Sequence, residues 1–219
     1  MKQSTPRHIG IIPDGTRRWS RNNATNLDEG YALTMSRLRD VIASVFDNGV
    51  EVLSVYLLSL DNLSRSPDDL DPVIRQESIF LEHFIPEIVQ RYSAVIHIVG
   101  RLDPLPDPLR LIAKRTRAAS QHEGLRKLNL LIGYNPLDEL LSAVARTGTE
   151  HFDLAALSVP ESVDLVIRTG NDQRMSGFLP LQSMYAELVF LPTTFNDTLV
   201  SKFVDEIRHF GERERRFGT

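Results

Sequence analysis

The chain has 219 residues, a length that one hydrophobic core supports, and 42% of them are hydrophobic, as in a folded globule rather than a disordered segment. Its net charge of -4 argues against a surface that wraps nucleic acid, and the absence of cysteine excludes disulfide frameworks, thiolate metal sites and cysteine nucleophiles. The length predicts one domain over residues 1–219, and the lack of cysteine fits a cytoplasmic location. Because no apolar run approaches the roughly 18 residues that cross a bilayer, we expect no integral membrane association.

Short apolar runs alternate with longer helix-periodic stretches along the chain. In chain order, the predicted elements are a strand at 8–12, a helix at 28–48, a strand at 51–58, a helix at 68–92, a strand at 94–99, a helix at 109–121, a strand at 128–133, a short helix after Pro136, a strand at 163–167 and a closing helix at 196–210. Within 68–92, Pro72 suits the first turn, whereas Pro86 should kink or divide the helix. The alternation predicts an α/β fold with a largely parallel central sheet flanked by helices.

Three polar segments follow predicted strands, at 13–19, 59–65 and 168–176. Ligands of open parallel sheets bind at the carboxyl ends of the strands, so these segments are the first candidates for a site. They contain five arginines, namely Arg17, Arg18, Arg65, Arg168 and Arg174. Guanidinium groups suit bidentate contacts to phosphate, and the arginines therefore predict a polyanion-binding rim.

Asp14 is the exception within this basic rim. A carboxylate beside Arg18 would repel phosphate unless a divalent cation lay between them, and Mg²⁺ is the natural choice. Mg²⁺ held by Asp14, diphosphate and water would neutralise a departing diphosphate. The alternative is that Asp14 and Gly15 only form a turn.

An apolar stripe on the predicted helix at 68–92 could line a slot beside the rim. It consists of Phe80, Leu81, Phe84, Ile85, Ile88 and Val89. Together with the rim, this stripe points to a diphosphate that carries an apolar tail.

Other patterns favour structural interpretations. Asp68, Asp69 and Asp71 resemble a metal-binding cluster, but aspartates at a helix start commonly cap it and complement its dipole. The six histidines show no metal-ligand spacing, and Walker, GxGxxG, HExxH and GxSxG patterns are absent.

The polar segments belong to four sequence blocks that occur in the same order in one enzyme family. They are HIGIIPDG with Arg18 and Trp19; Ser59, Asn62 and Arg65; VDLVIRTG through Arg174, Ser176, Phe178 and Gln182 to YAEL; and RERRFG at 213–218. With these blocks the chain resembles the cis-prenyltransferase family, also called the undecaprenyl diphosphate synthase family. The resemblance implies the cis-prenyltransferase fold and a Mg²⁺-dependent enzyme that acts on prenyl diphosphates.

The resemblance also implies roles for individual residues. Asp14 would hold Mg²⁺ on the allylic diphosphate while Arg18 and adjoining backbone N–H groups bind its oxygens, with Gly15, Thr16, Arg17 and Trp19 in the same block. Arg168, Arg174 and Ser176 would form the second diphosphate site, with Glu187 assisting the metal. Ser59, Asn62, Arg65 and Asp69 would belong to a segment that closes over substrate. The expected assembly is a homodimer in which the C-terminal arginines reach the partner's site.

The chain departs from elongating relatives at the allylic site. Those relatives usually carry Asn and Gly at the positions of Thr16 and Arg17, Arg at Leu27, His at Tyr31 and Trp at Leu63. In these positions the chain is more similar to the lavandulyl-type branch, whose members join allylic diphosphates head to middle. We therefore predict dimethylallyl diphosphate as acceptor and dimethylallyl or geranyl diphosphate as donor. The proton acceptor is left open between diphosphate and a hydroxyl such as that of Tyr31.

Two other functions compete with this prediction. One is regular short-chain cis elongation with isopentenyl diphosphate, and the other is a non-catalytic prenyl-diphosphate-binding subunit. Retention of Asp14 argues against the second.

Overall fold

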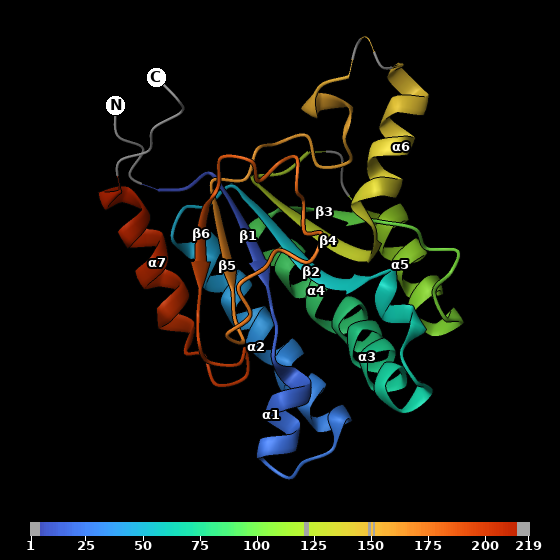
Figure 1. The fold of residues 1–219 in the computed structure, drawn as a ribbon, viewed down its shortest axis with the longest axis vertical. Coiled ribbons are helices and arrows are strands. Elements are labelled where there is room, and N and C mark those ends of the chain that lie inside the picture. The colour runs from blue at the N-terminus through green and yellow to red at the C-terminus, as the bar shows by residue number, and fades with distance from the viewer. Residues whose placement is uncertain (1–4, 121–122, 149, 151, 214–219) are drawn as a thin grey trace.

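A six-stranded sheet runs through the centre of this computed structural model, which describes residues 5–120, 123–148, 150 and 152–213 (Figure 1). The strands are β1 His8–Ile12, β2 Val52–Ser59, β3 Ala94–Val99, β4 Arg126–Tyr134, β5 Leu165–Arg168 and β6 Glu187–Phe190. They lie in the order β3-β4-β2-β1-β5-β6, and each neighbouring pair is parallel. The predicted single-domain α/β fold is confirmed, and β6 is a strand that the prediction missed.

Both faces of the sheet are buried, which explains why its strands are continuous apolar runs. Successive side chains of a strand point to opposite faces, so Ile9 and Ile11 of β1 enter one hydrophobic cluster and Ile12 enters the other. The same alternation assigns Leu165 and Ile167 of β5 to the first cluster and Val166 to the second.

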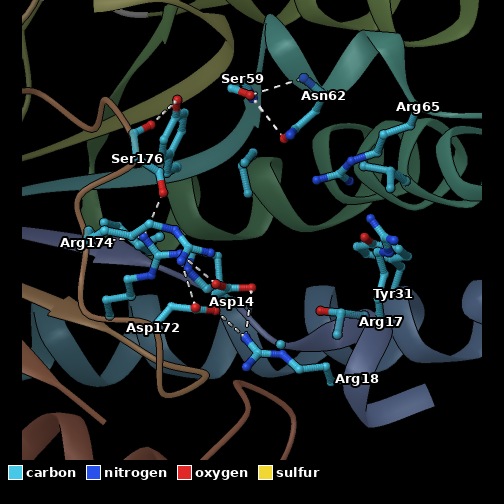
Figure 2. A pocket seen from close by; sticks show the side chains of 18 of the residues that line it. Asp14, Arg17, Arg18, Tyr31, Ser59, Asn62, Arg65, Asp172, Arg174 and Ser176 are labelled. Carbon is cyan, nitrogen blue, oxygen red and sulfur yellow. Dashed lines mark hydrogen bonds and ion pairs between the residues drawn. The ribbon is translucent and has the colours of Figure 1, made fainter. Parts of the chain in front are cut away.

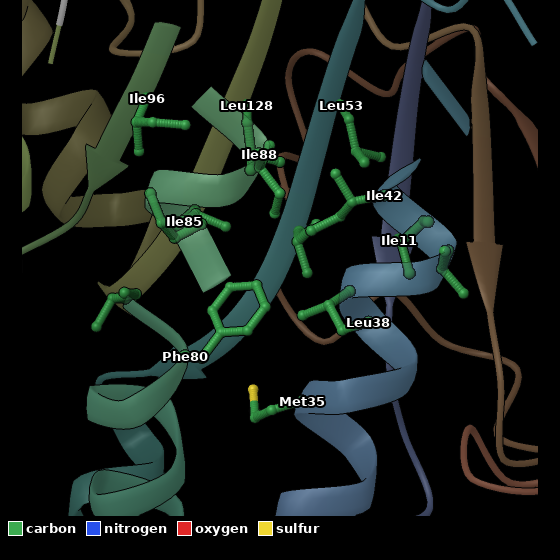
Figure 3. Close-up of a cluster of buried hydrophobic side chains, with 14 of the residues drawn as sticks. Ile11, Met35, Leu38, Ile42, Leu53, Phe80, Ile85, Ile88, Ile96 and Leu128 are labelled. Carbon is green, nitrogen blue, oxygen red and sulfur yellow. The ribbon is translucent and has the colours of Figure 1, made fainter. Parts of the chain in front are cut away.

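Five helices cover the first face: α2 Leu27–Asp47, α3 Pro67–Ile79, α4 Ile85–Tyr92, α5 Asp107–Ala119 and α7 Val200–Glu212. α2 begins where the side chain of Asn26 accepts a hydrogen bond from the Glu29 amide. Its apolar stripe includes Leu38 and Ile42, which are fully buried against the α3–α4 region (Figure 3). Burial of each such side chain contributes roughly 1.5–3 kcal/mol.

The second face is covered differently: the loops that flank β5 supply its apolar cluster together with strand side chains, and the helix α6 Pro136–Thr147, which follows β4, contributes no residue to that cluster. Phe178 and Leu179 of the loop after β5 are fully buried in this second cluster. A Cβ at Gly10 of β1 would lie 2.4 Å from the Phe178 ring, so the close approach of the loop requires glycine there. Helices therefore cover the first face, whereas loops supply most of the apolar cover of the second.

The predicted helix at 68–92 is divided, as Pro86 indicated. A π-helical segment, η2 Phe80–Phe84, separates α3 from α4, and Pro86 lies in the first turn of α4. The placement of Pro72 in a first turn is wrong, because Ser66 and Pro67 already begin α3 and Pro72 lies inside it. Asp68 and Asp69 lie in the first turn of α3, as expected of residues that complement a helix dipole.

Three short helical segments complete the described chain: α1 Thr16–Asn22, η1 Asp61–Ser64 and η3 Leu154–Ala156. α1 lies in a stretch for which the sequence pattern predicted no helix. Among the helices that the structure describes, none combines the length and apolarity needed to cross a bilayer.

Candidate active site

The carboxyl ends of β1, β2 and β5 open into a cavity of about 410 Å³. It lies where the strand order reverses, since β1 has β2 on one side and β5 on the other, and such switch points leave a crevice between diverging loops. The cavity is lined by Ile12, Pro13, Asp14, Gly15, Thr16, Arg17, Arg18, Arg21, Tyr31, Tyr56, Leu57, Ser59, Asn62, Arg65, Val73, Arg168, Asp172, Arg174 and Ser176. All three polar segments that the sequence singled out contribute to it.

Asp14 lies between arginines from two parts of the chain (Figure 2). Its Oδ2 accepts a hydrogen bond of 2.7 Å from Nη2 of Arg168, whereas its Oδ1 is 3.6 Å from Nη2 of Arg18. The hydroxyl of Thr169, the residue after β5, bonds both the backbone N–H and the backbone carbonyl of Asp14 at 2.9 Å. These bonds fix the Asp14 backbone against the end of β5, so the carboxylate is positioned before any ligand binds.

The loop after β5 is organised by Arg168, whose side chain is only 4% exposed. Its Nη1 donates to Ser176 Oγ at 2.8 Å and also to the Arg174 carbonyl. Ser176 has a φ of +50°, a backbone conformation that is uncommon outside glycine. Asp172 in the same loop contacts Arg18 at 2.8 Å and Arg174 at 2.9 Å. The loop therefore presents a compact network of alternating charges.

α1 carries the second group of cations. Arg17, Arg18 and Arg21 line the cavity from this helix, and Nη2 of Arg17 is 3.4 Å from the Asp69 carboxylate of α3. Gly15 precedes the helix with a φ of +107°, and a Cβ there would lie 2.8 Å from Thr194. Arg21 was missed by the sequence analysis because α1 was not recognised; its spacing of four from Arg17 places both on one helical face.

The segment after β2 closes a third side of the cavity. The backbone N–H of Asn62 donates to Ser59 Oγ at 3.2 Å, and the backbone N–H of Ser59 donates to the side-chain Oδ1 of Asn62 at 3.3 Å. This reciprocal pairing shapes the turn that leads to Arg65 (Figure 2). The pairing of β2 with β4 shifts register between Tyr56 and Ser59, and this irregularity lets Tyr56, Leu57 and Ser59 all face the cavity.

The apolar part of the cavity comes from Ile12, Leu57, Val73 and the rings of Tyr31 and Tyr56. Burial raises the pKa of the Tyr56 hydroxyl to about 12 and also raises that of Tyr31, where Arg65 opposes the change. Both hydroxyls are therefore neutral near pH 7, and that of Tyr56 donates a hydrogen bond of 3.2 Å to the Ser176 carbonyl in the loop after β5.

The expectation that residues 80–89 provide this apolar wall is wrong. None of the six predicted side chains lines the cavity, and Phe80, Leu81, Ile85 and Ile88 are instead part of the core against α2 and the sheet. Leu81, Ile85 and Val89 border a different hollow of about 330 Å³ between the η2–α4 region and α5. The apolar stripe of η2 and α4 faces the core. The apolar residue of this region that lines the cavity is Val73, which lies earlier in the chain, on α3.

Twelve of the predicted site residues line the cavity, and the other two, Trp19 and Glu187, do not. Trp19 is not among the lining residues, and its indole N–H donates to Asp197 at 2.9 Å. Glu187 starts β6 and pairs in register with Leu165, so it lies at the strand end opposite to Arg168 and is not brought beside Asp14 within this chain. Thr16 lines the cavity, but its hydroxyl bonds that of Thr34 in the interior at 2.8 Å.

The C-terminal arginines are described only at Arg213. Its guanidinium lies 3.3 Å from the Glu187 carboxylate. The remainder of that block, at 214–218, lies outside the described residues.

The donor atoms of the cavity fit a hard divalent cation that is shared with substrate. Within the described residues no group of three or more His, Asp or Glu side chains converges as a metal site. Asp14, however, offers a partly exposed carboxylate whose Oδ1 has no close hydrogen bond. Mg²⁺ commonly binds through one or two carboxylates together with substrate phosphates and water, so one aspartate is sufficient on the protein side.

The sequence of this chain is similar to a described protein family and to individual known enzymes. Residues 12–218 match the family model described as "Putative undecaprenyl diphosphate synthase". A tritrans,polycis-undecaprenyl-diphosphate synthase (GGDP specific) of Sulfolobus acidocaldarius is 30% identical, over 98% of this chain and 88% of that protein. Isoprenyl transferase 2 of Streptomyces coelicolor is 32% identical, over 97% of this chain and 90% of that protein.

Two solved structures share the fold. A lavandulyl diphosphate synthase from Lavandula x intermedia, in complex with dimethylallyl diphosphate, superposes with a TM-score of 0.91 at 24% identity, covering 99% of each chain. A probable undecaprenyl diphosphate synthase from Campylobacter jejuni gives a TM-score of 0.79 at 26% identity, covering 99% of this chain and 100% of that one.

Proposed function

We propose a function for this chain from the premise that it belongs to the undecaprenyl diphosphate synthase family of prenyltransferases. Within that family, we propose that it is a Mg²⁺-dependent enzyme that joins two allylic diphosphates head to middle. Dimethylallyl diphosphate is the acceptor, dimethylallyl or geranyl diphosphate is the donor, and the product is a branched terpenoid diphosphate. A cytoplasmic location belongs to the same proposal.

The observation that carries this proposal is the presence of two cationic groups on either side of Asp14. Arg17, Arg18 and Arg21 approach from α1, while Arg168 approaches from the end of β5 and Arg174 from the loop that follows. Two separate groups of guanidinium donors suit two diphosphates rather than one. The carboxylate between them suits the cation that a leaving diphosphate requires.

The first group would hold the donor and the second the acceptor. When Mg²⁺ is bound with Asp14 and the donor diphosphate, it supplies the positive charge that stabilises the departing diphosphate. Arg18 binds the same diphosphate, and Arg168 and Ser176 hold the acceptor diphosphate so that the alkene faces the allylic carbon. The apolar wall of Leu57, Val73 and Tyr31 excludes water from the allylic cation.

The regiochemistry rests on the residues of the donor side. Thr16, Arg17 and Tyr31 line this cavity at positions where the elongating enzymes that the chain resembles carry other residues. A volume of about 410 Å³ suits short hydrocarbon chains rather than a long polyprenyl product. The likeness to the lavandulyl diphosphate synthase concerns the fold, and it is compatible with this assignment without deciding it.

Incubation of the purified protein with Mg²⁺ and each pair of substrates tests the function, with mass spectrometry of the dephosphorylated products. We expect branched products from two allylic diphosphates and none without a divalent cation. The Asp14→Ala variant should fold but lose turnover by roughly 10²–10³-fold, the effect typical of removing one electrostatic contact to a transition state. Full activity of that variant, or of metal-free enzyme, would contradict the proposed role of the cation.

Regular cis elongation is the second candidate, because the relatives named above include undecaprenyl diphosphate synthases. It predicts linear cis products that form only when isopentenyl diphosphate is supplied. A non-catalytic binding subunit predicts tight binding of prenyl diphosphates without any product. The same assay therefore separates all three functions.

A homodimer is the proposed assembly. β6 is an edge strand of the sheet. Leu188 on this strand is 44% exposed, and Met184, just before the strand, is 64% exposed. Exposed apolar side chains on an unpaired sheet edge are a surface that a second chain would cover.

A further inference from the structure

The turn that carries Ser176, in the loop after β5, has a strained backbone. The backbone N–H of Phe178 donates to the Met175 carbonyl at 2.9 Å and closes a four-residue turn. Its two central residues, Ser176 and Gly177, have φ values of +50° and +80°, the signs of a type I′ turn. Glycine adopts such a φ readily, but serine does not. A strained residue persists only where its surroundings hold it, so the contacts of Ser176 matter.

Two hydrogen bonds from other strands hold Ser176. Arg168 Nη1 of β5 donates to its Oγ at 2.8 Å, and the Tyr56 hydroxyl of β2 donates to its carbonyl at 3.2 Å. The first bond fixes the side chain, and the second fixes the peptide bond that follows. A serine hydroxyl has one hydrogen to donate. Because Ser176 Oγ accepts from Arg168, that hydrogen is left for an anion in the cavity.

The Tyr56 ring is itself fixed, so its hydroxyl has a defined position. The centroid of the ring lies 5.8 Å from that of Phe178 and 6.0 Å from that of Tyr134, both of which are fully buried. In the sheet, β1 lies between β2 and β5. Tyr56 therefore reaches across β1 to a residue 120 positions later in the chain.

Burial alone does not require the bond between Tyr56 and Ser176. Tyr56 is only partly buried and lines the cavity, where water could satisfy its hydroxyl. The polar side chains that follow it, Ser59 and Asn62, are paired with the backbone of each other. The Tyr56 hydroxyl is thus the group of β2 that joins this strand to the Ser176 turn, on the side of the cavity where Arg174 also lies (Figure 2).

We propose that Tyr56 is a positioning residue for the acceptor diphosphate, a role that rests on the proposed prenyl transfer. Its hydroxyl keeps the turn at 175–178 in the conformation in which Ser176 and Arg168 present their donors to that diphosphate. Tyr56 itself takes no part in bond making or breaking. A fixed acceptor diphosphate determines which carbon of the alkene faces the allylic cation, so the turn affects the geometry of the reaction as well as binding.

Steady-state kinetics of Tyr56→Phe in the full-length enzyme tests the inference, using the substrate pair that gives product. The phenylalanine keeps the ring contacts and removes only the hydroxyl. The acceptor KM should rise by roughly 3–10-fold, the effect of losing one hydrogen bond, whereas the donor KM should change by less than about twofold. A purely structural role would instead lower the melting temperature and leave the ratio of the two KM values as in wild type.

Tyr92→Phe is the matched control. The hydroxyl of Tyr92 on α4 also donates to a backbone carbonyl, that of Ala43 at 3.1 Å, and Tyr92 does not line the cavity. Removal of this hydroxyl should leave both KM values as in wild type. An equal rise of the acceptor KM in the two variants would overturn the role of Tyr56.

A double-mutant cycle with Ser176→Ala tests whether Tyr56 acts through Ser176. Residues that act as one unit are not additive. The acceptor KM of Tyr56→Phe/Ser176→Ala should therefore lie within about twofold of that of Ser176→Ala alone. If the two single effects multiply, Tyr56 acts independently of Ser176 and the proposal is wrong.

The outcomes also separate this inference from the function on which it rests. If wild type makes product and Tyr56→Phe keeps the wild-type acceptor KM, the role of Tyr56 is overturned and prenyl transfer stands. If wild type converts no pair of prenyl diphosphates, the proposed function fails, and calorimetric titration with inorganic diphosphate decides about the turn. Weaker binding by Tyr56→Phe than by Tyr92→Phe would support the role of Tyr56 in anion binding, and equal binding would overturn it.

Discussion

At the scale of single residues, the site is organised around the contact between Asp14 and Arg168. These residues are 154 positions apart, yet their side chains meet at 2.7 Å because β1 and β5 are neighbouring parallel strands that end at the same edge. Arg168 uses its other terminal nitrogen, Nη1, to hold Ser176 and the Arg174 carbonyl. A planar group with several fixed donors can do this, whereas a lysine ammonium could not satisfy the same set.

Replacement of Arg168 by alanine tests its assignment to the acceptor diphosphate. We expect the acceptor KM to rise by roughly 10–100-fold, the loss typical of a charge-assisted hydrogen bond, with a smaller rise in the donor KM because Arg168 also bonds the Asp14 carboxylate. Steady-state kinetics with each substrate varied in turn provides the measurement. Arg101→Ala, which removes a surface contact to Asp138, is the matched control. An unchanged acceptor KM in Arg168→Ala would count against the assignment.

At the scale of elements, the position of α1 depends on the turn that precedes it. Gly15 adopts a φ that L-residues rarely reach, and its Cα approaches Thr194 so closely that a Cβ has no room. The turn thereby directs three arginines of a seven-residue helix toward the cavity. The sequence pattern indicates the glycine and two of the arginines but not the helix, because seven residues with a single tryptophan show no clear apolar period.

Gly15→Ala should therefore reduce both stability and activity. The strained φ and the contact with Thr194 should lower the free energy of unfolding by about 1–3 kcal/mol, and displacement of α1 should lower kcat. Gly49→Ala is the matched control, since Gly49 also has a positive φ but a Cβ there would meet nothing within 4 Å. Denaturant unfolding and turnover of the two variants provide the comparison. Equal kcat values in both would show that α1 tolerates the displacement.

At the scale of the whole molecule, the cavity and the exposed edge strand lie in different places. The cavity is at the carboxyl ends of β1, β2 and β5, whereas β6 ends the sheet. Glu187 belongs to that edge and contacts Arg213 there. The residue that the family resemblance assigned to the metal is therefore part of the surface through which we expect two chains to meet, at the opposite strand end from Asp14.

A charge placed on this edge should disrupt the proposed dimer. We expect wild type to have twice the mass of one chain in light scattering after gel filtration at micromolar concentration. Leu188→Asp should shift it toward the mass of a single chain, because a buried unpaired carboxylate is costly. Leu111→Asp, on an exposed position of α5, should leave the mass unchanged. A wild-type protein that is monomeric under these conditions would contradict the assembly.

The spacing of apolar residues and the positions of proline and glycine were sufficient to predict the order of most strands and helices, because these signals act over a few residues. The same local signals placed Asp14, Arg18, Arg65 and Arg168 at strand ends, and parallel strands then bring those ends together. Pairing along the sheet and helix rotation are long-range, and only the tertiary structure decided them. They placed the apolar side chains of residues 80–89 in and against the core, and they put Glu187 at the opposite strand end from Arg168. An apolar stripe tells which face of a helix is buried, but the neighbours of that face depend on how the helices pack, and no local pattern carries that information.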